Sequence, residues 1–151
     1  MRVIVFFAAA CVAAAVSACS TDGGFSGAMT DRAGRPLGIA QAHFIWTGAS
    51  GDLTIDTPEG ERFVGRAVSA RQHVDHDPRI VVRPGDTQDR PTYEFGGDET
   101  VSTGVLTAEL VGDRGHSMSC RVTEARPGWG FEGGGAGVCT RSDGARMSVS
   151  F

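Results

Sequence analysis

The sequence contains no lysine, and its 14 basic side chains are all arginine, set against 18 aspartates and glutamates for a formal net charge of −4. Proteins that bind nucleic acid present a basic face, so this balance argues against DNA or RNA as a partner. The chain also lacks a Walker A loop, a dinucleotide-binding fingerprint and a G-x-S-x-G nucleophile elbow. We therefore expect no enzymatic activity and no cofactor.

Helical periodicity is also missing, because no window after residue 20 repeats its apolar residues every 3.6 positions. Apolar and polar residues instead alternate, which is typical of half-buried antiparallel strands. The alternating apolar residues are Ala40, Ala42, Phe44 and Trp46; Leu53 and Ile55; Met118, Cys120 and Val122; and Met147, Val149 and Phe151. We predict one all-β domain over residues 37–151, a small antiparallel barrel or sandwich of about seven to nine short strands.

Two segments depart from the alternation. Residues 72–100 contain three prolines, and within them residues 79–83 and 92–95 are expected to form a short hairpin or edge strands. The glycine-rich segment 126–137 contains Trp129 and Phe131. These two rings form either a lid folded onto the core or an exposed contact patch, and the lid is favoured because exposed aromatic surface is costly without a partner.

The N-terminus carries an apolar run of 14 residues, 3–16, after Met1 and Arg2. This run is too short to span a bilayer, which needs about 20 residues, and it fits the apolar region of a secretory signal peptide. The Val-Ser-Ala-Cys sequence that ends at Cys19 resembles the lipobox of bacterial lipoproteins. The resemblance implies cleavage of a signal peptide at residues 1–18 and attachment of acyl chains such as palmitate to Cys19.

The same resemblance predicts where the protein resides. Two or more acyl chains anchor a protein stably to a membrane, and Ser20 after the cysteine favours the outer membrane over the inner one. We expect a lipid-anchored protein of the cell envelope that faces the periplasm. Residues 19–36 are polar and rich in glycine, which predicts a flexible lipidated tether between membrane and domain.

Cysteine usage fits that compartment. Of four cysteines, Cys11 leaves with the signal peptide and Cys19 carries lipid, so Cys120 and Cys139 remain. An even remainder in an oxidising compartment predicts one disulfide. A zinc site would need more ligands than this pair offers.

One polar cluster is a weak candidate for a metal site. His73, Asp75 and His76 combine imidazole and carboxylate groups, which suit transition metals. A third ligand to join the pair His73 and His76 would have to come from elsewhere, from His43 or His116. The alternative, which we favour, is an acidic loop exposed to solvent before Pro78.

Other segments resemble known proteins. The Gly-Glu-Arg-Phe-Val-Gly sequence at residues 60–65, the glycine-rich stretch before Cys139 and the Asp143-Gly144 turn resemble small uncharacterised proteobacterial envelope lipoproteins. The sequence at residues 142–146 resembles a turn of the periplasmic inhibitors of c-type lysozyme. We expect a non-enzymatic module that binds an envelope protein or cell-wall component; the alternatives are an inhibitor of a cell-wall hydrolase and a metal-binding domain.

Overall fold

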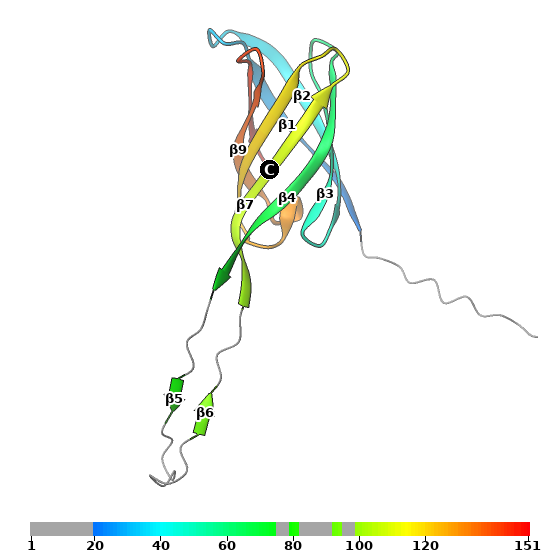
Figure 1. Ribbon diagram of the computed structural model, residues 1–151. Helices are drawn as coiled ribbons and strands as arrows, with labels where there is room; N and C mark the ends of the chain where they lie inside the picture. The colour runs from blue at the N-terminus through cyan, green and yellow to red at the C-terminus, as the bar shows by residue number, and fades with distance from the viewer. Residues whose placement is uncertain (1–19, 75–78, 82–91, 95–98) are drawn as a thin grey trace, which may run out of the picture.

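The computed structural model describes residues 20–74, 79–81, 92–94 and 99–151, and eight of its strands form a closed antiparallel barrel (Figure 1). The barrel strands are β1 (Thr21–Thr30), β2 (Pro36–Thr47), β3 (Ser50–Asp56), β4 (Arg62–Val74), β7 (Glu99–Gly112), β8 (Ser117–Glu124), β9 (Gly135–Arg141) and β10 (Arg146–Ser150). Each strand pairs with the next barrel strand along the chain, and β10 closes the barrel on β1. The all-β prediction is confirmed, with a barrel as the architecture.

The alternation found in the sequence is the alternation of inside and outside. Along β8, Met118, Cys120 and Val122 are buried while the residues between them are exposed. The inward side chains of β2, β3 and β10 follow the same period of two residues. These side chains join one hydrophobic core, as expected for an eight-stranded barrel, whose interior is just wide enough for side chains to fill.

The predicted flexible tether over residues 19–36 is wrong for most of its length. β1 runs from Thr21 to Thr30, pairs with both β2 and β10, and buries Phe25 and Met29 in the core. Two glycines occupy inward positions of this strand, where a Cβ on Gly27 would lie 2.8 Å from Cε of Met147. Because glycine makes room for a large neighbour there, the strand lacks an obvious apolar alternation, and the domain begins near Thr21 rather than Leu37.

Strands β4 and β7 are longer than the barrel wall. β3 pairs with β4 only as far as Val68, and β8 pairs with β7 only from Val105. Beyond these points β4 and β7 continue to pair with each other, from Arg71 opposite Ser102 to Val74 opposite Glu99. We call this two-stranded extension, residues 71–74 and 99–102, the ribbon.

Two short strands complete the description. β5 (Arg79–Val81) pairs in antiparallel fashion with β6 (Thr92–Glu94), as in the short hairpin that is one of the two alternatives expected for this region. The residues described include no helix long and apolar enough to cross a membrane.

The Cys120–Cys139 disulfide is present and links two neighbouring strands. Cys120 on β8 lies directly opposite Cys139 on β9, and both side chains point into the core. The link therefore lies within the paired part of β8 and β9, and the two strands continue to pair beyond it as far as Glu124 opposite Gly135, where the long connection at residues 125–134 begins.

Candidate binding surface at one end of the barrel

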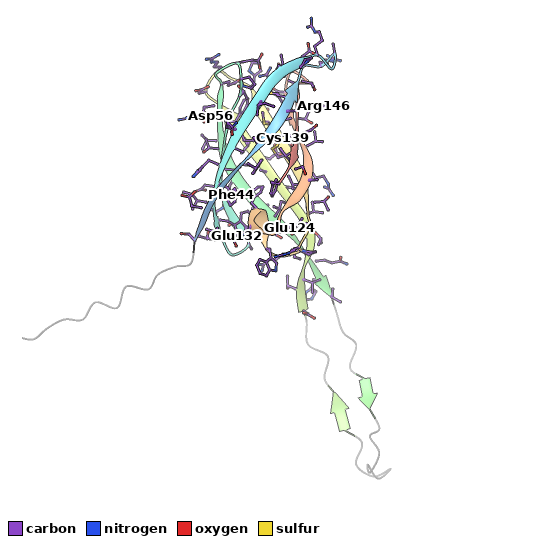
Figure 2. All side chains as sticks on the ribbon, turned by 180° about the vertical axis from the view of Figure 1, so that it is seen from behind. Phe44, Asp56, Glu124, Glu132, Cys139 and Arg146 are labelled. Atoms are coloured by element: carbon purple, nitrogen blue, oxygen red, sulfur yellow. A yellow bond between two sulfur atoms is a disulfide. The ribbon has the colours of Figure 1, made fainter. Side chains whose placement is uncertain are left out.

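The two ends of the barrel differ in construction. At one end, which we call the turn end, four tight turns join β1 to β2, β3 to β4, β7 to β8 and β9 to β10. At the other end, which we call the ribbon end, lie the start of β1, the β2–β3 turn, the ribbon and the long β8–β9 connection. Figure 2 shows Asp56 and Arg146 toward the turn end, and Glu124 and Glu132 at the ribbon end.

The turn end is closed by a cluster of charged side chains. Arg141 continues the inward register of β9, and its side chain is 7% exposed. Its guanidinium contacts Glu59, lies 4.0 Å from Glu61 and donates from Nη2 to Oδ2 of Asp143 at 2.7 Å. Nδ1 of His116 lies 2.9 Å from Oε2 of the buried Glu61.

These groups are paired with one another, and the pairing is reflected in their proton affinities. The hydrogen bond from Arg141 lowers the pKa of Asp143 to about 2, and the Ala145 amide adds to the effect. The hydrogen bonds to Asp143 and Glu59 raise the pKa of Arg141. The Asp143 carboxylate in the turn at residues 142–146 thus bonds back to Arg141 of its own barrel, and we assign the cluster a structural role.

The ribbon end is organised by Glu124. This residue takes the next inward position of β8 after Val122, and it is 5% exposed. Its Oε1 accepts a hydrogen bond from the amide of Gly130 at 2.6 Å, and its Oε2 accepts from the amide of Gly128 at 3.1 Å. The Ser102 hydroxyl donates to the same Oε2 at 3.3 Å. One buried carboxylate therefore fixes the β8–β9 connection and ties it to the base of the ribbon.

The connection directs its two aromatic rings in opposite directions. Phe131 lies in the 3₁₀ turn η1 (Gly130–Gly133) and packs into the barrel mouth, with its ring centroid 5.0 Å from Phe44 and 5.4 Å from Phe25. Trp129 is 55% exposed, and Cζ of Arg126 lies 5.6 Å from its ring centroid. The predicted lid is confirmed for Phe131 and wrong for Trp129, whose ring is exposed.

Two hollows adjoin at this end, because both are lined by Gly48 and Gly128. The first has a volume of about 280 Å³, and its other lining residues are Thr21, Trp46, Trp129 and Glu132. The second has a volume of about 210 Å³, and its wall includes Ser69, Arg71, Thr100 and Ser102. Binding sites combine a concave surface, an aromatic ring and a few placed polar groups, so the paired hollows are the candidate site.

Of the three weak candidates for a metal ligand in this segment, His73 is the one that the structure describes. His73 lies on the ribbon, opposite Thr100 in the β4–β7 register, while Asp75 and His76 fall outside the described residues. His116 lies at the turn end, so it is not available as a third ligand for His73. Nε2 of His43 lies 2.6 Å from Oδ1 of Asp22. Within the described part of the chain, no group of three or more His, Cys, Asp or Glu side chains could hold a metal ion.

Sequence reasoning missed Glu124, the central residue of this end. The signal was present, because Glu124 follows Met118, Cys120 and Val122 at the same spacing of two residues. No comparable spacing in the sequence marks the polar residues of the second hollow, Ser69, Arg71 and Ser102.

Comparison with known proteins identifies no family for this chain. The chain matches no protein-family model, and it shows no significant similarity to a curated protein or a solved structure. The resemblance to envelope lipoproteins therefore stays a prediction.

Proposed function

We propose that this protein is a lipid-anchored envelope protein that acts as a non-enzymatic binding module and makes its contacts through the ribbon end. The leader and Cys19 support the location at the periplasmic face of the outer membrane, since acylation of Cys19 would hold the chain at a membrane. The filled barrel supports a surface site, because its inward side chains pack against one another.

The observation that carries the binding role is the exposed ring of Trp129. Among the residues whose side chains the structure describes, Trp129 is the one exposed aromatic. Tryptophan is enriched at the contact points of binding surfaces, and here the backbone on both sides of it is fixed by Glu124. A buried carboxylate thus holds an apolar ring in water beside two hollows, an arrangement that favours an external partner.

The location is tested by the mass of the protein isolated from membranes. We expect a chain that begins at Cys19 and carries acyl groups, and Cys19→Ser should release the protein from the membrane fraction. An uncleaved chain without lipid would contradict the location.

The binding role is tested by photo-crosslinking in intact cells. The photoreactive residue p-benzoylphenylalanine is placed at position 132, where Glu132 lines the first hollow, and at position 64 on the outer wall, where Val64 is 52% exposed. We expect adducts from position 132 that are absent from position 64 and are lost with Trp129→Ala. Equal adducts from both positions, or none from position 132, would overturn the role.

A further inference from the structure

We infer that the two hollows at the ribbon end bind a saccharide, with one sugar ring stacked on Trp129 and its neighbour in the second hollow. The inference rests on the proposed binding function and names the ligand class. A sugar has a face of C–H bonds that packs on an aromatic ring, and hydroxyls that both donate and accept hydrogen bonds.

The lining residues supply both kinds of contact. The first hollow combines the exposed ring of Trp129 with the carboxylate of Glu132, which accepts hydrogen bonds. The second offers the hydroxyls of Ser69 and Ser102 and the guanidinium of Arg71. The two serine hydroxyls lie 3.1 Å apart, and Ser102 is also tied to Glu124, so these groups are held in place before a ligand arrives.

Other ligand classes fit less well. Glu132 lines the first hollow and the Glu124 carboxylate contacts Ser102 in the second, so an anion would meet negative charge beside Arg71. A metal cation would lack ligands, because the described residues contain no suitable group of three acidic, histidine or cysteine side chains. An apolar ligand would cover the Arg71 guanidinium without offering it an acceptor, which is costly for a charged group. A neutral polyhydroxyl compound satisfies both the ring and the polar groups.

The volumes of the two hollows and their position in the chain narrow the class of ligand further. The volumes of about 280 and 210 Å³ lie below those of most sites for drug-sized ligands, about 300–1,000 Å³, and the shared wall suits two linked rings. Thr21 lines the first hollow, and Cys19 precedes it by two residues, or about 7 Å of extended chain. An acylated Cys19 would keep the site near the bilayer, where both the wall glycan and the sugar headgroup of a glycolipid supply this chemistry.

Tryptophan fluorescence provides the first test, because the chain has two tryptophans and both line the first hollow. The purified full-length mature protein is titrated with the tetramer of N-acetylglucosamine, and calorimetry gives the affinity independently. We expect a saturable change in emission and an affinity that falls about tenfold in Trp129→Ala, a typical scale for one aromatic contact. Val111→Ala, at an outer-wall residue that is 71% exposed, is the matched control and should bind like the wild type.

Two further probes distinguish the sources of the sugar, and they are used with a chain that begins at Ser20, which keeps the whole barrel and carries no acyl group to bind the vesicles. Purified peptidoglycan sacculi should retain the protein if the wall glycan is the source, and vesicles containing monoglucosyl diacylglycerol should do so if a glycolipid is. Retention by plain phospholipid vesicles alone, or equal affinity of the Trp129→Ala and wild-type proteins, would overturn the inference. If no sugar probe binds while adducts from position 132 persist in cells, the saccharide is excluded and the binding module stands; loss of those adducts as well overturns both.

Discussion

Glu124 and Gly130 are six residues apart along the chain and are joined by a hydrogen bond of 2.6 Å from the Gly130 amide to the buried carboxylate. Trp129 lies immediately before Gly130 and is exposed. A Cβ on Gly130 would come within 2.3 Å of the Trp46 indole, and its φ of +62° favours glycine. The position of the exposed ring is thus set by one buried carboxylate and one glycine.

Substituting Glu124 tests this relationship. Glu124→Ala leaves the Gly128 and Gly130 amides without their acceptor, and we expect the free energy of unfolding to fall by about 2–3 kcal/mol, as for hydrogen bonds to a charged group. Urea denaturation measures the loss, and amide hydrogen exchange should show faster exchange at these two glycines. Glu109→Ala is the control, since that exposed carboxylate bonds to the Ser119 hydroxyl on the outer wall; equal effects of the two changes would contradict the account.

The disulfide should contribute strongly to stability. It closes a segment with a sequence separation of 19 residues, and such a link stabilises a small domain by about 3 kcal/mol. We expect Cys120→Ala/Cys139→Ala to lower the free energy of unfolding by about that amount. Dithiothreitol should lower the urea midpoint of the wild type and leave that of the double variant unchanged. A wild-type urea midpoint that is the same with and without dithiothreitol would refute the prediction.

Acid sensitivity should depend on Asp143. Arg141 holds the pKa of this carboxyl at about 2 in the folded protein, against 3.8 as its ordinary value. The stabilisation is therefore fully present above pH 3.8 and is lost as the pH falls through 2. Asp143→Asn should be less stable than the wild type at neutral pH and should lose less stability between pH 4 and 2.

The measurement for Asp143 is the free energy of unfolding at a series of pH values. Asp52→Asn removes the same charge at an exposed position of β3 and is the control. Identical pH profiles for the wild type and Asp143→Asn would show that the Arg141 pair does not stabilise the fold.

β1 should be as necessary to the barrel as any other strand. Phe25→Ala removes a ring that lies 5.4 Å from Phe131 and 4.6 Å from Phe151, measured between centroids. A buried phenylalanine truncated to alanine costs about 3–5 kcal/mol, so the melting temperature should fall markedly. Ser26→Ala, at the next position, which is exposed, should change the melting temperature little. If Phe25→Ala also left the melting temperature unchanged, residues 20–30 would behave as the tether expected from composition.

These results show what the sequence could and could not predict. Alternation identified the inward faces of β2, β3, β8 and β10, because the two-residue period of a strand is local. It failed on β1, where Gly23 and Gly27 take inward positions and leave room for Phe44 and Met147. Because glycine-rich sequence is typical of linkers, the composition of residues 19–36 predicts a tether where the chain forms a barrel strand.

Closure and site geometry depend on contacts that the local pattern does not contain. The pairing of β1 with β10 closes the eight strands into a barrel, and without it they would form one open sheet. The contact between Glu61 and His116 joins residues 55 positions apart. Glu61 could have been placed inside, since it precedes the buried Phe63 by two residues, but no rule of spacing names its partner.

The most direct test of the account is the nuclear magnetic resonance footprint of bound wall fragments on the ¹⁵N-labelled protein. Peptidoglycan solubilised with a muramidase is the titrant. We predict that the amides of Gly48, Ser102 and Gly128 and the indole N–H of Trp129 shift in a saturable way, while the Gly144 amide at the turn end does not. Shifts confined to the turn end would contradict the claim that the protein binds its partner through the ribbon end, and no shift at the hollows would exclude the wall glycan as their ligand.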